Sequence, residues 1–188
     1  MRQTDYVILG LLAEQPLSGY QIKKIVDIRF RFFWSESFGQ IFPALKSLAA
    51  AGLVEEYPQE ASGGHAAKTY QITPAGKEAL VEWISQPVEK ESLRLEILLK
   101  TYFSGYAAPD VMLAHLATFE QSHAQQLHIL GLFQEELLRI PDEDENHGDI
   151  LRVIDFGLKA NRAYLDWCRE TRDYFTKKQA HLRETTKE

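Results

Sequence analysis

Apolar side chains recur at intervals of three and four residues through the first fifty residues, which is the spacing of amphipathic helices. Residues 4–14 are apolar on nearly every face, which predicts a helix that is buried on more than one side. Pro16 and Gly19 then interrupt the pattern. A second helix is therefore expected from about Gly19 to Phe30, with Ser18 as its N-cap.

A third helix is predicted to be capped between Ser37 and Gly39 and to end at Gly52 as its C′ residue. Its apolar face carries Ile41, Leu45, Leu48 and Ala49. Pro43 lies inside this pattern, where proline removes a backbone N–H and crowds the preceding turn. We expect Pro43 in or just past the first turn, where it fixes the entry of the helix at little cost.

Two short alternating runs follow, at residues 53–57 and 68–73, and the loop between them contains Gly63 and Gly64. This pattern predicts a β-hairpin. Thr73 and Pro74 then suit the N-cap and the first position of a fourth helix. Three helices followed by a hairpin are the layout of a winged helix-turn-helix domain, which we assign to residues 1–86.

Residues 87–188 have an almost entirely helical pattern, with helices expected at 91–106, at 108–140 and from 149 to about 180. The last helix has two neighbouring apolar stripes. One, which includes Leu158, is expected to pack within the chain. The other is expected to pack against a partner helix, although both could be covered internally; it contains Val153, Gly157, Ala160, Tyr164, Trp167 and Tyr174. The prediction is a mainly α protein with a small β-hairpin, whose second domain is a helical dimerisation domain.

Charge is unevenly distributed along the chain, whose formal net charge is −6. Residues 15–50 carry a local excess of positive charge, with two acidic residues, Asp27 and Glu36, against five basic ones: Lys23, Lys24, Arg29, Arg31 and Lys46. A single cysteine excludes an internal disulfide, and no apolar run approaches the roughly 20 residues of a membrane helix. We therefore expect a cytoplasmic protein with no membrane partner.

Several segments together resemble the PadR family of bacterial transcriptional regulators. "YVILGLLAEQPLSGYQI" is similar to the first two helices of that family, "WSESFGQIFPALKSLAAAGLV" to its recognition helix, and "KTYQITPAGKEAL" to its second wing strand and the following helix. "LKTYFSG" and "YLDWCRE" resemble the start of its C-terminal region and its dimerisation helix. The length is similar to that of the shorter-tailed subfamily, which includes repressors of phenolic acid decarboxylase genes.

The resemblance implies a homodimeric repressor that places one helix per subunit in the major groove of an inverted-repeat operator. It also implies release by a small aromatic or xenobiotic effector, often bound near the dimer interface. The alternative is a winged-helix protein–protein interaction module with little DNA binding, which the acidic isoelectric point and a weakly basic wing would suit.

Candidate DNA-binding residues lie on the second helix, on the third helix and in the wing. A DNA-binding domain must neutralise phosphates and read base edges. The second helix offers backbone contacts from Tyr20, Lys23 and Lys24, although Tyr20 also suits a packing role. The recognition segment offers Ser35, Ser37, Gln40, Phe42 and Lys46, with Gln40 suited to adenine and Lys46 to phosphate or guanine. The family usually has tyrosine at Phe42, and its wing often carries arginines where this chain has only His65 and Lys68.

The sequence gives weaker indications of an effector pocket, a metal site or catalysis. By resemblance, an effector pocket or dimer interface would involve Trp167, Tyr164, Gly157, Ala160 and Leu158. Glu120 and His123 have an E-x-x-H spacing, but the second such pair that a di-iron site needs is absent from the sequence, so no metal and no cofactor are expected. No phosphate loop, nucleophile elbow or catalytic triad is evident, so catalysis is not expected.

Overall fold

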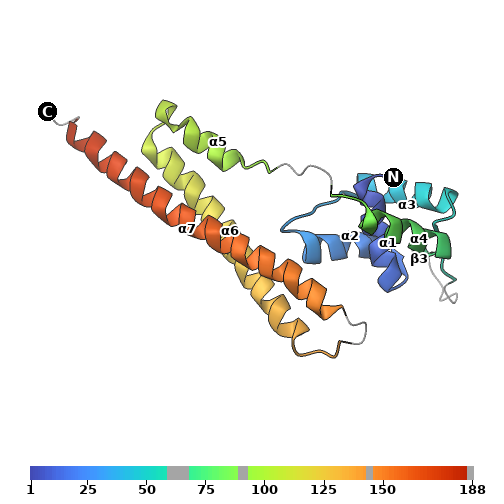
Figure 1. The fold of residues 1–188 in the computed structure, drawn as a ribbon. Helices are drawn as coiled ribbons and strands as arrows, with labels where there is room; N and C mark the ends of the chain where they lie inside the picture. Colours follow the sequence, from blue (N-terminus) through green and yellow to red (C-terminus); the bar gives the residue numbers. More distant parts are fainter. Residues whose placement is uncertain (59–67, 89–92, 143–145, 186–188) are drawn as a thin grey trace, which may run out of the picture. The chain divides into compact units, whose positions relative to one another are not determined.

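The structure is a computed structural model that describes residues 1–58, 68–88, 93–142 and 146–185. The chain forms two compact units, Met1–Lys90 and Glu91–Glu188 (Figure 1), and each unit has its own hydrophobic core. The domain boundary at residues 86 and 87 stays a prediction.

The first unit has the predicted order of helices and strands, with an added strand and with a π-helical turn at the end of the predicted second helix. Its elements are α1 (Gln3–Glu14), β1 (Leu17–Ser18), α2 (Gly19–Ile25), the π-helical turn η1 (Val26–Phe30), α3 (Phe38–Ala50), β2 (Val54–Glu56), β3 (Thr69–Ile72) and α4 (Pro74–Ser85). The predicted hairpin pairs Val54 with Ile72, but β1 adds a third antiparallel strand, so that the sheet order is β1-β3-β2. The sequence pattern did not indicate β1, because two residues are too few to show alternation.

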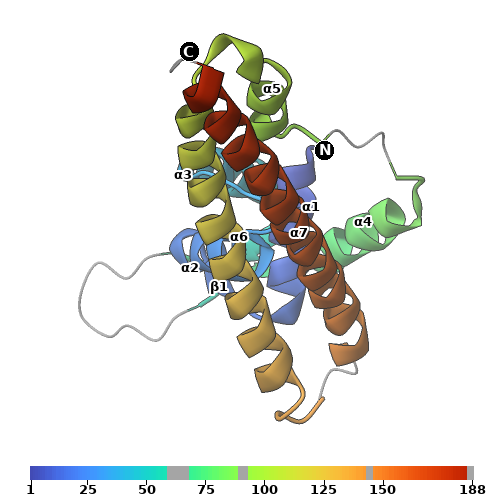
Figure 2. The same ribbon diagram turned by 90° about the vertical axis from the view of Figure 1, so that its left-hand side faces the viewer.

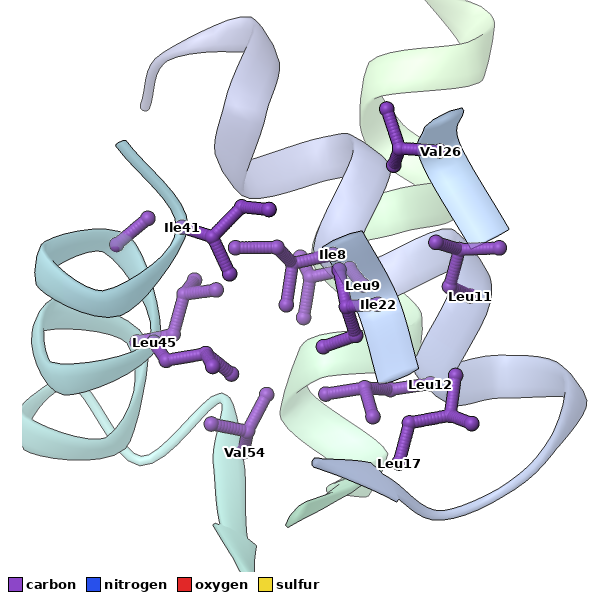
Figure 3. Packing of buried hydrophobic residues seen from close by; sticks show 12 residues of the cluster. Ile8, Leu9, Leu11, Leu12, Leu17, Ile22, Val26, Ile41, Leu45 and Val54 are labelled. Carbon is purple, nitrogen blue, oxygen red and sulfur yellow. The ribbon is translucent and has the colours of Figure 1, made fainter. Parts of the chain in front are cut away.

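The core of the first unit forms around α1, as its nearly uniform apolar surface predicted. Ile8, Leu9, Leu11 and Leu12 are at most 2% exposed. They pack with buried side chains of α2, η1, α3 and β2, among them Ile22, Val26, Ile41, Leu45 and Val54 (Figure 3). Burying a side chain of this size contributes about 1.5–3 kcal/mol. The inner face of α3 is therefore firmly held, which fixes the direction of its outer face.

Helix α3 begins and ends at the predicted residues, and its proline lies just past the first turn, as expected. Ser37 is the N-cap, and Gly52 has a φ of 71° at the C′ position. The Leu53 N–H donates to the Leu48 carbonyl at 3.0 Å, which is the long bond of a Schellman motif. Pro43 is the sixth residue of the helix and lies in its second turn. It therefore removes the bond that an N–H there would make to the Gly39 carbonyl, so the helix loses one internal hydrogen bond.

The end of α3 is tied to the start of α4 through Thr73. The Thr73 hydroxyl donates to the Gly52 carbonyl at 2.8 Å and accepts from the Gly76 N–H at 3.1 Å, as an N-cap does. The two segments approach so closely that a Cβ atom on Gly76 would lie 2.1 Å from the Leu53 carbonyl oxygen. This junction holds α3, the strands β2 and β3, and α4 in one arrangement.

The second unit consists of α5 (Glu96–Tyr102), the 3-10 turn η2 (Ser104–Tyr106), α6 (Pro109–Leu137) and α7 (His147–Thr185). The single helix predicted over residues 91–106 is wrong, because α5 ends at Tyr102 and Ser104 and Gly105 form a turn; serine and glycine favour turns over helix interiors. Helices α6 and α7 lie side by side, and α5 lies at the end where α6 begins (Figures 1 and 2). Their core contains Ile97, Met112, Leu116, Cys168 and Phe175. Within the described residues, no helix is both long and apolar enough to cross a membrane.

Candidate nucleic-acid interface

Helices α2 and α3 begin with the same S-x-x-Q arrangement. At α2, the Ser18 backbone N–H and hydroxyl both donate to Gln21 Oε1 at 2.8 Å. At α3, the Ser37 N–H and hydroxyl donate to Gln40 Oε1 at 2.9 and 2.8 Å. In each case the glutamine oxygen accepts the hydrogen bonds of the N-cap serine, as in a capping box.

This arrangement changes what Gln40 can recognise. A carbonyl oxygen has two lone pairs, and Ser37 occupies both of those on Gln40 Oε1. Bidentate pairing with adenine would use that oxygen as an acceptor, so it requires breaking the cap. While the cap is intact, Gln40 offers only its Nε2 donors, which suit a phosphate oxygen or a base acceptor such as guanine N7 or O6.

The exposed face of α3 is largely apolar in its first two turns. Its exposed residues are Phe38, Gly39, Gln40, Phe42, Pro43, Lys46, Ser47 and Ala50. Gln40, Phe42 and Lys46 on this face are candidate DNA-binding residues from the sequence, whereas Phe38 is an additional exposed residue. The signal for Phe38 was its spacing, because residues four apart in a helix share a face and Phe38 lies four before Phe42.

Three exposed aromatic rings join the start of α2 to the start of α3. Tyr20, Phe38 and Phe42 are 61%, 45% and 41% exposed. Their ring centroids lie 5.3–5.9 Å apart in all three pairs, and Lys23 Nζ lies 5.7 Å from the centroid of Phe38. Tyr20 is thus more exposed than a packing role would require, and it packs against the two phenylalanines rather than the core.

The cations of the basic segment divide into paired and unpaired groups. Lys23 forms an ion pair with Asp27, and Arg29 with Glu14 at 3.0 Å. Lys24, Arg31 and Lys46 are exposed, and no ion pair to them is found among the described residues. An unpaired cation can approach a phosphate without first giving up an acid partner, so Lys24 and Lys46 are the better placed candidates.

The described part of the wing offers less free positive charge than its sequence suggests. Lys68 forms an ion pair with Glu56 across the hairpin, and this hydrogen bond to the carboxylate raises the pKa of Lys68. His65 lies outside the described residues. Ser35 and Ser37 are exposed before α3, whereas Glu36 between them is buried and accepts a hydrogen bond from Trp34 Nε1 at 2.8 Å.

In the second unit, the residues suggested for an effector pocket or dimer interface are largely engaged within the chain. Gly157 and Leu158 are buried and Ala160 is half-buried. The ring centroids of Tyr164 and Trp167, both half-buried, lie 5.9 and 6.0 Å from that of Phe119 on α6. Part of the stripe assigned to a partner helix therefore packs against α6.

The E-x-x-H pair of α6 is also engaged. Glu120 forms an ion pair with Arg172 of α7. His123 Nδ1 lies 2.7 Å from Asn161 Oδ1, while Asn161 Nδ2 donates to the Gly157 carbonyl at 2.8 Å. Because that amide oxygen can only accept, His123 carries a proton on Nδ1. No group of three or more metal-ligating side chains occurs in the described part of the chain.

A three-helix core, a wing and an exposed second helix of the helix-turn-helix define a winged helix-turn-helix protein of the DNA-binding class. Residues 8–82 match the family model "Transcriptional regulator PadR-like family", and residues 93–176 match "Virulence activator alpha C-term". Over residues 8–82 the chain is therefore similar to the PadR-like family of transcriptional regulators.

Three relatives illustrate the similarity. The "Negative transcriptional regulator PadR" of Bacillus subtilis is 36% identical over 105 residues, which span 55% of this chain and 57% of that protein, little more than half of its length. The crystal structure of Bacillus subtilis PadR in complex with operator DNA aligns with a TM-score of 0.75 and 26% identity, over 93% of this chain and 99% of that one. The structure of the same protein with p-coumaric acid aligns with a TM-score of 0.70 at the same identity and coverage.

Proposed function

We propose that the protein is a homodimeric repressor that binds an inverted-repeat operator through α3 and is released by a small aromatic effector. The observation that carries this proposal is the outer surface of α3, which is exposed from Phe38 onward while the inner face is fixed in the core. The operator complex of the relative and its name as a negative regulator support the same role. Such a protein would act in the cytoplasm, where bacterial DNA lies.

Phosphate contacts are assigned to the two exposed, unpaired lysines. Lys24 lies on α2 and Lys46 on the exposed face of α3, so they can flank a groove that α3 enters. Each phosphate contact releases a counterion and makes the slope of log K against log salt steeper by about 0.9. The paired Lys68 is expected to add little.

An anisotropy titration of labelled upstream intergenic DNA tests DNA binding by the full chain. Lys24→Ala and Lys46→Ala should each weaken binding and reduce the salt slope by about 1. Lys177→Ala, which removes an equal charge from an exposed site on α7, serves as the control and should change neither. Equal affinity for this DNA and for an unrelated duplex, with no salt dependence, would refute the proposal.

The homodimer is supported by apolar side chains on α7 that stay exposed among the described residues of its own unit. Val153, Phe156 and Tyr174 are 44%, 66% and 58% exposed. Val153 and Phe156 lie three apart and so share a face. Light scattering should give twice the 21.6 kDa mass of the chain, and Phe156→Glu should give the single-chain mass, because a carboxylate would be buried in the interface. A monomeric wild-type protein at micromolar concentration would contradict this.

The effector is proposed to be a small aromatic acid or a similar flat molecule. Support comes from the relative bound to p-coumaric acid and from the rings of Phe119, Tyr164 and Trp167 in this chain. Addition of p-coumaric acid should lower the anisotropy of the protein–DNA complex, and Trp167→Ala should shift this response to higher concentration. A complex that p-coumaric acid and related phenolic acids leave unchanged would remove this part of the proposal.

A further inference from the structure

The first two turns of α3 present an unusual surface to the DNA groove. Of the exposed side chains there, only Gln40 is polar, and its amide oxygen is occupied by Ser37. The remaining exposed residues of those turns are Phe38, Gly39, Phe42 and Pro43. These side chains therefore have few free hydrogen-bonding groups with which to recognise bases at this end of the helix.

The two phenylalanines are held in place rather than loosely exposed. Each contacts the ring of Tyr20, and their own centroids are 5.9 Å apart. Phe42 also fits closely over Gly19, where an added Cβ atom would lie 2.7 Å from Phe42 Cε1. The absence of a side chain at Gly19 thus makes room for the ring, which gives a fixed apolar surface at the N-terminal end of α3.

The surroundings of this apolar surface favour a polyanion. Lys23 lies over Phe38, and the unpaired Lys24 and Lys46 are on the same two helices. A helix N-terminus also attracts phosphate. In the major groove, the one apolar group that a base pair presents is the C5-methyl of thymine, and phenylalanine is among the residues that contact it.

We propose that Phe38 and Phe42 read thymine methyl groups in the operator, so that each half-site carries thymine under these rings. This inference rests on the proposed function, because it names what the recognition helix selects. Tyr20 supports the two rings from α2 and acts as a positioning residue.

The test uses a duplex isolated by the full-length protein from a random-sequence DNA library. Each thymine is replaced singly by deoxyuridine, which removes the methyl group and keeps the base pair. At two positions in each half-site, one for each phenylalanine, affinity should fall about fourfold per methyl group. Phe38→Ala and Phe42→Ala should each abolish the effect of one such replacement and leave the effect at the other position.

The controls separate this inference from the proposed function. Circular dichroism, together with binding of each variant to a poly(dG)·poly(dC) duplex, reports whether the variant is folded and keeps its phosphate contacts. A selected duplex that binds tightly but ignores every deoxyuridine replacement would overturn the thymine reading and leave the repressor proposal standing. A deoxyuridine effect that persists in both variants would assign the methyl groups to other residues. Failure to select any duplex would overturn both proposals, and loss of self-association in Phe38→Ala would make the cluster a protein interface.

Discussion

Gln40 joins two roles that substitution can separate: it caps α3 through its oxygen and can contact DNA through its nitrogen. Gln40→Glu keeps an oxygen that accepts from the Ser37 N–H and hydroxyl, as the present side chain does at 2.9 and 2.8 Å. It removes both Nε2 donors and adds a negative charge. Gln40→Ala removes the acceptor and the donors together.

The expected stabilities follow from the capping arrangement. Loss of a capping interaction costs about 0.5–1 kcal/mol at an exposed site such as this one, so Gln40→Ala should lower Tm by roughly 1–4 °C. A carboxylate in the first turn gains about 0.3–1 kcal/mol from the helix dipole, so Gln40→Glu should match or exceed the wild-type Tm. Relative to the wild-type protein, Gln40→Ala should therefore be less stable and Gln40→Glu equally or more stable.

The DNA affinity of Gln40→Glu is expected to fall even though its stability does not. Gln40→Glu loses a hydrogen bond and places a negative charge against phosphates, which should weaken DNA binding at least tenfold, or about 1.4 kcal/mol. Thermal unfolding and anisotropy titration at constant salt measure the two effects, with Gln125→Glu on exposed α6 as a control for added charge. If Gln40→Glu binds as tightly as wild type, Gln40 does not face the DNA; if it melts as low as Gln40→Ala, the capping role is wrong.

Three further predictions concern stability and reactivity. Gly76→Ala should cost roughly 2–4 kcal/mol in urea unfolding, because its Cβ would meet the Leu53 carbonyl oxygen at 2.1 Å, whereas Gly10→Ala, with open space around it, should stabilise α1 by about 0.5–1 kcal/mol. Phe175→Ala should cost about 3–5 kcal/mol, since this ring is 1% exposed in the core of the second unit. Burial raises the pKa of the Cys168 thiol, so a thiol reagent at pH 8 should label the native protein slowly and the urea-unfolded protein completely.

A different result would contradict each of these three predictions. Equal stabilities for Gly76→Ala and Gly10→Ala would mean that α4 does not approach the end of α3 as closely as the structure has it. A loss below 1 kcal/mol for Phe175→Ala would place that ring near solvent. Labelling of native Cys168 as fast as that of a free thiol would show that α6 and α7 open readily.

The helices of the first unit were predictable because their signals are local. Ser18, Ser37 and Thr73 are N-caps, and Gly52 adopts the left-handed conformation that ends a helix. Strand β1 was not predictable, because Leu17 is a strand residue only through its pairing with Tyr70, more than fifty residues away. A two-residue strand carries no periodicity of its own.

At the candidate site, the sequence indicates which side chains are exposed on α3 but not which of their atoms are free. The S-x-x-Q spacing itself indicates that Gln40 caps α3, and the structure shows this cap, which the assignment of Gln40 to adenine recognition did not take into account. The Lys23–Asp27 pair follows from i,i+4 spacing. The Lys68–Glu56 pair depends on the register of two strands, which spacing alone does not determine.

Helix α7 shows the same limit for packing. Periodicity places a side chain on a face of a helix but does not say which neighbour covers that face. Tyr164 and Trp167 belong to the stripe expected to meet a partner, yet they pack against Phe119 of α6 in the same chain. Phe156, which neither stripe included, is 66% exposed and is the most exposed of the large apolar side chains of α7 among the described residues. A dimer built on α7 therefore has to use the segment around Phe156 more than the segment around Trp167, and this is why Phe156→Glu, rather than a change at Trp167, is the decisive substitution for self-association.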